Sequence, residues 1–308
     1  MALEKAFRFL IQRHESLRTA FRRIENQPAQ VVLQEVDWGL GFEDLQGQEP
    51  QGALRSRIVE EFVEHSFDLA EGVLLKVKLF RISDDRHLLG MVMHHIIADA
   101  WSVSILLNEL AQVYQCFCDE QGPSLPALSI QYKDFAVWQK EQLDQKKFAV
   151  QELFWKEQLQ MPIPQLGIPT DFERGYQKNF DGKCLTKILS REELNALEKF
   201  GQSCDTTLFS VLLMSVQAFL HRYTGDKDVV VGTTAAGRNR AELEDQIGFF
   251  VNVLPLRQRF DSDIRMNDLL QEVTANYQKA ISCEDYPFGE LIGQLDIPQS
   301  SSRNPVFD

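Results

Sequence analysis

Two adjacent histidines and an aspartate four residues further on are the side chains of this chain whose types and spacing best suit chemistry. His94, His95 and Asp99 lie in the stretch MHHIIADAWS, residues 93–102. An imidazole can accept a proton near neutral pH, and a neighbouring carboxylate can orient it or balance its charge. The same residues also suit an ordinary turn in which the aspartate caps a helix. The spacing alone leaves both interpretations open.

The flanking sequence predicts a loop between a strand and a helix around these three residues. Residues 73–82 and 87–93 are apolar or alternating and are separated by Asp84-Asp85-Arg86, which predicts a β-hairpin. Residues 101–118 have one apolar helical pattern, with Asp99 or Ser102 near its start as a cap. A loop at the end of a strand is a common place for catalytic side chains.

Length and composition limit the class of protein. The 308 residues are enough for two core-forming units. The chain has 45 acidic and 32 basic residues, a net charge of −13, and no dense cationic block, which argues against a nucleic-acid partner. No apolar run approaches the roughly 18 to 20 residues that span a bilayer. The five scattered cysteines and the lack of a secretory signal favour a cytoplasmic location, with all five cysteines structural.

Strand and helix patterns occur on both sides of a proline- and glycine-rich stretch, which predicts an α/β protein with two subdomains. The predicted N-terminal subdomain is 1–160, the linker is 161–182, and the C-terminal subdomain is 183–308. Helices are expected at 1–21, 132–138, 149–160, after the capping box Ser190–Glu193, at 206–223 and at 265–282. Further strands are expected at 30–34, 183–189, 228–234 and 247–257.

Other kinds of catalytic site have less support. Neighbouring histidines in one loop rarely bind the same metal ion, and neither H-E-x-x-H nor a cysteine cluster accompanies them, so no metal is expected. The chain also has no G-x-S-x-G elbow and no Walker loop, which leaves serine hydrolases and nucleotidases without support.

Six stretches together resemble signatures of the condensation domains of nonribosomal peptide synthetases, which belong to the chloramphenicol acetyltransferase-like HHxxxDG acyltransferases. MHHIIADAWS is similar to the pattern M-H-H-x-x-x-D-G-W-S. RHESLRTAF at 13–21 is similar to R-H-E-x-L-R-T-x-F, and YKDFAVW at 132–138 to Y-x-D-F-A-V-W. Three later stretches are similar to further signatures: IGFFVNVLPLR at 247–257, EDYPFG at 284–289 and SRNPV at 302–306.

The resemblance implies a fold, a reaction and partners. The fold would be two chloramphenicol acetyltransferase-like α/β subdomains, each an α+β sandwich, in a V-shaped pseudo-dimer with the histidine loop at their junction. The reaction would be peptide-bond formation, in which the amine of one aminoacyl group attacks the thioester of a donor group that is L-configured. Both groups would be carried on the phosphopantetheine arms of donor and acceptor peptidyl carrier proteins beside an adenylation domain. The domain itself would bind no cofactor, metal, nucleic acid or membrane.

The resemblance also assigns residues. His95 would be the base or the group that positions the amine, and the sequence leaves open which. His94 would pack beside it, and Asp99 and Ala100 would complete the catalytic loop. Asp99 is expected to form a buried ion pair with Arg13. Further support for the site is expected from Arg18, Trp101, Ser102, Trp138 and Asn252.

Some positions depart from the family pattern. Ala100 stands where the family has glycine, and Val253 where threonine is usual. The family's first signature is missing, and the chain stops at Asp308, directly after the last signature. Both ends of the full domain are therefore expected to be lacking. A truncated or degenerate module that binds carrier proteins without catalysis is the alternative function.

Overall fold

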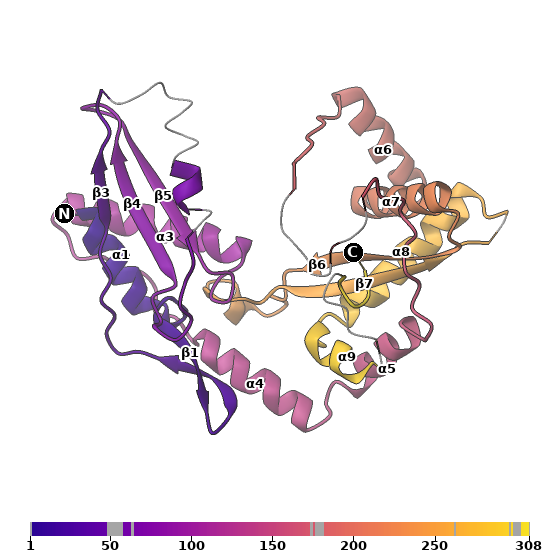
Figure 1. Ribbon diagram of the computed structural model, residues 1–308, viewed down its shortest axis with the longest axis horizontal. Helices are drawn as coiled ribbons and strands as arrows, with labels where there is room; N and C mark the ends of the chain where they lie inside the picture. The colour runs from indigo at the N-terminus through magenta and orange to yellow at the C-terminus, as the bar shows by residue number, and fades with distance from the viewer. Residues whose placement is uncertain are drawn as a thin grey trace. The chain divides into compact units, whose positions relative to one another are not determined.

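The computed structural model forms two compact units, each with strands of its own (Figure 1). The first unit is Met1–Asp144 with Arg238–Phe250, and the second is Gln145–Gly237 with Val251–Asp308. The residues that the structure describes are 2–47, 58–62, 65–172, 175, 182–261, 263–295, 297 and 303–307. Within these ranges no single helix is long and apolar enough to span a membrane, and one pair of helices meets that test only together, with a bend of 100°.

The two units are not the continuous segments that the sequence predicts. Helix α5 (Ala149–Gln158) belongs to the second unit, although the predicted boundary placed it in the N-terminal subdomain. The segment Arg238–Phe250 belongs to the first unit, although 183–308 was expected to be one subdomain. The Arg238 side chain and the Glu244 carbonyl of this segment contact residues more than a hundred positions earlier, and local composition carries no sign of such contacts. Of the predicted linker, 173–174 and 176–181 lie outside the described residues.

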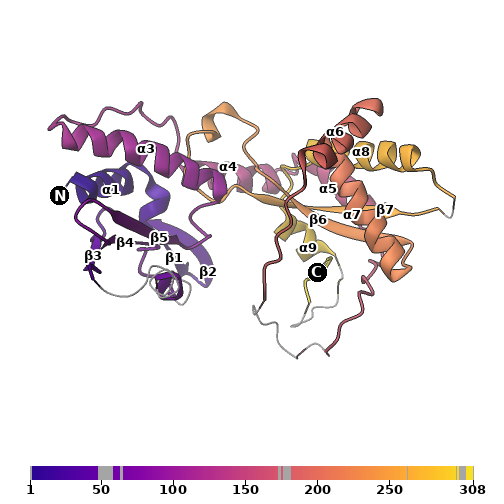
Figure 2. The same ribbon diagram turned by 90° about the horizontal axis from the view of Figure 1, so that it is seen from above.

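The sheet of the first unit has the order β3-β4-β5, from β3 (Gly41–Asp44), β4 (Leu75–Arg81) and β5 (His87–Met93). Strand β3 runs parallel to β4, and β4 and β5 form the predicted antiparallel hairpin. Helices α1 (Ala2–Arg13) and α3 (Ala100–Cys118) pack side by side over one face of this sheet (Figure 2). Helix α4 (Tyr132–Asp144) follows α3. The hairpin and α1 therefore fix the point at which the chain enters α3.

The N-terminal helix is shorter than predicted. It ends at Arg13 rather than near residue 21, and a 3-10 turn, η1 (Glu15–Arg18), leads into strand β1 (Thr19–Ile24). Strand β1 pairs antiparallel with β2 (Gln27–Val32), which confirms the strand predicted near residue 30. Thr19 and Phe21 favour strands, and the pairing of β1 with β2 outweighs the helical spacing of the apolar residues.

The core of the first unit lies between α1, α3 and the sheet. Its fully buried members include Phe7 and Leu10 of α1, Leu75 of β4 and Leu106 of α3. Each such side chain contributes about 1.5–3 kcal/mol by burial. The indole of Trp38 packs 5.4 Å from the ring of Phe7 and donates to the Leu75 carbonyl at 3.0 Å. This core holds β5 and α3 at a fixed separation.

The second unit is built on the antiparallel pair β6 (Asp228–Ala235) and β7 (Asn252–Arg259). Its longer helices are α6 (Arg191–Ser203), α7 (Leu208–Thr224) and α8 (Met266–Ser282), and the short α9 (Phe288–Gln294) follows them. Helix α7 contacts β6, and α8 contacts β7. Ser190 and Glu193 form the predicted capping box at the start of α6. The indole of Trp155 on α5 is buried and donates to the Cys283 carbonyl at 3.0 Å.

The predicted strand at 183–189 is wrong. These residues form no strand with any part of the chain that the structure describes, and the side chains of Leu185 and Ile188 are 96% and 88% exposed. An alternating apolar pattern specifies a strand only where a neighbouring strand accepts its hydrogen bonds. Of the strand expected at 247–257, β7 takes only Asn252 onward, because residues 247–250 belong to the segment that packs in the first unit.

Candidate active site

The histidine loop is fixed at both ends. On leaving β5, the His94 backbone N–H donates to the Leu74 carbonyl at 3.0 Å, and the Ile97 N–H donates to the His94 carbonyl at 3.1 Å. At the other end Asp99 is the N-cap of α3, as predicted, and accepts from the Ser102 N–H at 2.8 Å. A strand end and a helix cap therefore hold the six residues from His94 to Asp99 in one conformation.

The two imidazoles have opposite hydrogen-bonding roles. His95 Nδ1 lies 2.7 Å from the Ala98 carbonyl oxygen, which can only accept, so Nδ1 carries a proton. In the neutral ring the lone pair is then on His95 Nε2. In contrast, His94 Nδ1 accepts from the Ile96 N–H at 3.1 Å, so in the neutral ring the proton is on His94 Nε2. Of the two, His95 therefore presents an acceptor at its outer nitrogen and His94 a donor.

The surroundings of the two rings also differ. The side chain of His95 is exposed, and its ring stands perpendicular to that of Phe249, with 5.1 Å between the centroids. His94 is half-buried and packs edge-on with Phe67 at 6.2 Å. Both histidines line an open cavity of about 600 Å³ whose other walls come mostly from apolar residues, including Phe62 and Met93. A reactant can therefore reach His95.

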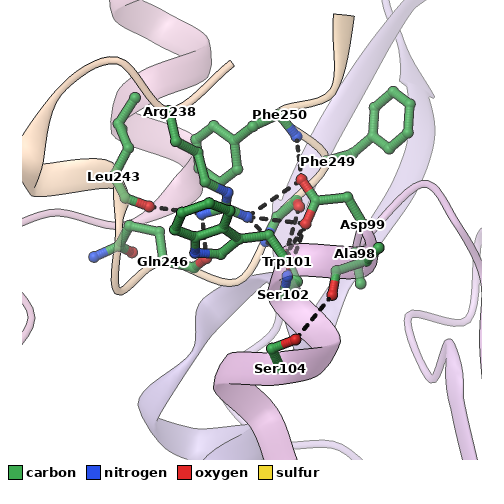
Figure 3. A network of polar contacts seen from close by, with 12 residues as sticks. Ala98, Asp99, Trp101, Ser102, Ser104, Arg238, Leu243, Gln246, Phe249 and Phe250 are labelled. Carbon is green, nitrogen blue, oxygen red and sulfur yellow. Dashed lines mark hydrogen bonds and ion pairs between the residues drawn. The ribbon is translucent and has the colours of Figure 1, made fainter. Parts of the chain in front are cut away.

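Asp99 is the centre of a buried polar network (Figure 3). Arg238 Nη2 donates to both of its carboxylate oxygens, at 3.0 and 3.2 Å, and the Phe250 N–H donates to Oδ2 at 3.2 Å. The Ser102 hydroxyl lies 2.7 Å from Asp99 Oδ1 and 2.8 Å from the Gly248 carbonyl. That hydroxyl also accepts from Arg238 Nη2 at 2.9 Å. The network thus ties the start of α3 to the segment 238–250.

The charge of Asp99 is stabilised although the side chain is buried. Burial alone would raise the pKa of this carboxyl group. The two hydrogen bonds from Ser102, the positive charge of Arg238 and the Phe250 N–H outweigh that effect and lower its pKa below the ordinary value of 3.8. Asp99 is therefore an anion paired with a cation at neutral pH, and its oxygens are occupied by these donors. It serves as an organiser of the loop rather than as a proton acceptor.

Arg238 is enclosed by aromatic and backbone groups. Its Nη1 donates to the carbonyls of Leu243 and Gln246 at 2.6 and 2.7 Å. The guanidinium lies 4.2 Å from the centroid of the Phe250 ring and 5.8 Å from that of Trp101. A planar guanidinium suits this site, because it can donate along several directions and stack on a ring at the same time.

Helix α4 covers the same segment with an aromatic face. The Tyr132 hydroxyl donates to the Phe249 carbonyl at 2.8 Å, and burial together with the charge of Asp99 raises the pKa of this phenol to about 12. Residue 248 must be glycine, because a Cβ there would lie 2.1 Å from the Tyr132 ring. The guanidinium of Arg240 lies over the Trp138 ring, with its carbon 4.4 Å from the ring centroid. YKDFAVW therefore packs against residues 238–250.

The predicted ion pair between Arg13 and Asp99 is wrong. Arg13 instead contacts Glu109 of α3, with its Nε 3.1 Å from Oε1, and His14 Nε2 lies 2.7 Å from Oε2 of the same carboxylate. Helix α1 packs against α3, so that Arg13 meets the middle of α3 and not its start. Ten residues of α-helix rise about 15 Å, a distance that an arginine side chain cannot cross.

The remaining predicted residues have varied positions. Trp101 is 47% exposed and donates to the Glu244 carbonyl at 3.0 Å, while Ala100 is an exposed residue in the first turn of α3. Arg18 bonds the carbonyl of Leu33 after β2 and is not part of the Asp99 network. Asn252 belongs to the second unit, where its amide donates to the Glu284 and Tyr286 carbonyls at 2.7 Å.

Sequence reasoning missed the cation of the network. Arg238 directly follows the small residues Ala235, Ala236 and Gly237. It is 139 residues from Asp99 in the chain. The available sign was an arginine directly after residues with small side chains, which is a second candidate cation for the Asp99 carboxylate besides Arg13.

Lowering the pH should destabilise the first unit partly through Glu109. Burial raises the pKa of this carboxyl group, but His14 and Arg13 outweigh burial and lower it below 4.5. A lowered folded-state pKa adds stability above the unfolded-state value, and that stability is lost as the pH falls below it. We expect the urea midpoint to fall from about pH 5 downward, and to fall less steeply in Glu109→Gln. The exposed Glu120→Gln is the control, and identical slopes in all three proteins would contradict the expectation.

Comparison with known proteins identifies the family. The model of the condensation domain family matches residues 1–308. The chain is 39% identical over 306 residues to gramicidin S synthase 2 of Aneurinibacillus migulanus, an alignment that covers 99% of this chain and 7% of that protein. It is therefore similar to a small part of a much longer synthase.

Solved structures share the fold. The X-domain in its complex with OxyB from teicoplanin biosynthesis is 26% identical, with a TM-score of 0.91, over 99% of this chain and 67% of that one. The condensation domain from the monacolin K polyketide synthase is 23% identical, with a TM-score of 0.84, over 99% of this chain and 71% of that one. The mixed helix and strand architecture is thus the expected chloramphenicol acetyltransferase-like α/β fold. On the match to the family model along its whole length, this chain belongs to the condensation domain family.

Proposed function

We propose that this chain forms amide bonds by aminolysis of a carrier-bound thioester, as expected for a condensation domain of a nonribosomal peptide synthetase. The observation that carries the proposal is the exposed His95 ring, whose Nδ1–H is bound to the Ala98 carbonyl so that Nε2 faces outward with its lone pair. Membership of the family and the similarity to part of gramicidin S synthase 2 support peptide synthesis as the setting.

In the proposed reaction the amine nitrogen of the acceptor aminoacyl group attacks the carbonyl carbon of the donor thioester. The C–N bond forms, the C–S bond breaks, and the donor arm leaves as a thiol. The amine must lose a proton, and the thiolate must gain one. His95 Nε2 can accept that proton or hold the amine by a hydrogen bond, since a free α-amine has a pKa of about 7.7 to 8.0 and is partly protonated at neutral pH.

The substrates and partners belong to the same proposal. The donor is expected to be L-configured, because the MHH…D-x-W-S stretch is similar to that of domains with such donors. Donor and acceptor would arrive on phosphopantetheine arms of peptidyl carrier proteins, next to an adenylation domain, and the domain would hold no cofactor of its own. Among the residues described, no group of three or more His, Cys, Asp or Glu side chains is placed to bind a metal ion.

A second candidate is a module that binds a partner without catalysis. One solved relative favours it, since the X-domain was determined in a complex with OxyB. Ala100, in place of the family glycine, is the position at which this chain departs from the active-site pattern.

An assay with two aminoacyl-loaded carrier proteins, run beside a binding titration with the same carriers, separates the two candidates. We expect a dipeptidyl product on the acceptor carrier and a second product, the free thiol, on the donor carrier. Binding of both carriers without either product would reject the catalytic proposal in favour of the binding module.

A further inference from the structure

The ring of Phe249 is the one aromatic group for which the structure describes a ring contact with His95. The two rings are perpendicular, with their centroids 5.1 Å apart. Phe249 is 39% exposed, whereas the next residue, Phe250, is 4% exposed. Phe249 thus stands at the surface beside the exposed imidazole and is not part of the core.

The backbone under Phe249 is held on three sides. The Gly248 N–H donates to the Ser102 hydroxyl at 3.1 Å. The Phe249 carbonyl accepts from the Tyr132 hydroxyl at 2.8 Å, and the Phe250 N–H donates to Asp99 Oδ2 at 3.2 Å. Three consecutive residues are therefore anchored to α3, α4 and the loop. These anchors fix the position of the Phe249 backbone and thus of its Cα–Cβ bond.

Asp99 connects both contacts of the His95 ring. The first contact is the Ala98 carbonyl, which belongs to the residue just before Asp99. The second is the Phe249 ring, which belongs to the residue just before Phe250, whose N–H Asp99 accepts. Both groups that contact the His95 ring therefore belong to residues next to an anchored one: Ala98 precedes Asp99, and Phe249 precedes Phe250.

One hydrogen bond does not fix the plane of an imidazole. The χ2 torsion of histidine has a broad range, and the ring can tilt about the line from Nδ1 to its acceptor. A perpendicular aromatic ring at about 5 Å favours one plane, since aromatic pairs prefer edge-to-face geometry. The Ala98 carbonyl and the Phe249 ring together leave one orientation, with Nε2 outward.

We propose that Phe249 is a positioning residue that holds the plane of the His95 imidazole and so aims Nε2 at the attacking amine. The effect on the rate rests on the function proposed above, whereas the effect on the ring does not. Orientation matters here because a displacement of about 1 Å can cost roughly a hundredfold in rate.

The ring contact is tested first in the unaltered protein. The chain has six histidines, and with ring-labelled histidine the His95 signals are assigned by their loss in His95→Gln. We expect cross-relaxation between the ring protons of His95 and Phe249, and 15N shifts of a single Nδ1–H tautomer at a pH where the ring is neutral. Absence of that cross-relaxation would overturn the proposal without any variant of Phe249.

The role is then tested with Phe249→Leu and Phe249→Tyr. In Phe249→Leu the His95 ring is free to turn about χ2, and its Nδ1–H then leaves the Ala98 carbonyl part of the time. The His95 15N shifts should therefore move toward the average of two tautomers, and kcat should fall about tenfold while KM stays within about twofold. Phe249→Tyr retains an aromatic ring and should keep the His95 15N shifts and kcat of the unaltered protein. The matched control is Phe42→Leu, which changes a phenylalanine of β3 that is 56% exposed. Unchanged His95 shifts in Phe249→Leu, or a loss in Phe249→Tyr equal to that in Phe249→Leu, would contradict the proposal.

These readouts separate the two proposals. If the unaltered protein makes no amide while its His95 signals respond to Phe249→Leu, the proposed function fails and the positioning role stands. If it makes amide at a rate that Phe249→Leu does not alter, and the His95 signals do not respond, the positioning role fails and the proposed function stands.

Discussion

Replacing His95 with alanine should lower the rate of amide formation by about 10² to 10⁴-fold, the range expected for loss of a proton acceptor in the transition state. The reason is local: His95 Nε2 is an exposed acceptor, while the outer nitrogen of His94 is a donor in the neutral ring. The measurement is the initial rate of dipeptide formation with two loaded carrier proteins. The free energy of unfolding should change little, because the His95 side chain is exposed.

The control for this variant is His87→Ala. His87 is an exposed histidine of β5, so it matches His95 in residue type and in being exposed. It should keep the unaltered rate. Amide formation by His95→Ala at the rate of His87→Ala would remove His95 from the mechanism, and a drop in both would point to β5 rather than to the imidazole.

Replacing Arg238 with alanine should destabilise the first unit by about 3–5 kcal/mol, the usual cost of leaving a buried charge without its partner. Arg238 and Asp99 have side chains 1% and 0% exposed, and each is bonded to backbone groups as well as to the other. Removing the cation leaves the Asp99 carboxylate buried with only its neutral donors. Urea unfolding, compared at equal pH, measures the loss.

Two further variants test whether the loss comes from the unpaired charge. Arg240→Ala removes a cation from the same segment, where the guanidinium lies over Trp138, and should cost only about 0.5–1 kcal/mol. The double variant Asp99→Ala with Arg238→Ala removes both charges, and its cost should be well below the sum of the two single costs. Additive costs would show that the two side chains contribute independently and would contradict the coupling.

The elements around the histidine loop could be predicted because their signals are local. The hairpin of β4 and β5, the length of α3 and the capping role of Asp99 follow from the alternation, spacing and cap chemistry of residues next to one another. The pairing of Asp99 could not be predicted in this way. Arg13 and Arg238 are both arginines near signature stretches, and only the packing of α1 along α3 decides between them.

The failed strand at 183–189 and the shortened α1 have the same physical cause. Whether Leu185 and Ile188 form a strand depends on a partner that supplies hydrogen bonds, and whether Thr19 to Phe21 continue a helix depends on the competing pairing with β2. The orientation of the His95 ring could not be predicted from the sequence either, because it depends on the Ala98 carbonyl and on Phe249, which follows His95 by 154 positions.

Because the segment 238–250 is part of the first unit, that unit cannot be completed on the ribosome until this segment has been synthesised. Asp99 precedes Arg238 by 139 residues, so at about 5–20 residues per second it emerges roughly 7 to 30 seconds before its cation. During that interval the start of α3 has a carboxylate that cannot be buried at low cost. The first unit begins to be translated first, but it cannot finish folding until α5, α6, α7, β6 and the segment 238–250 have been synthesised.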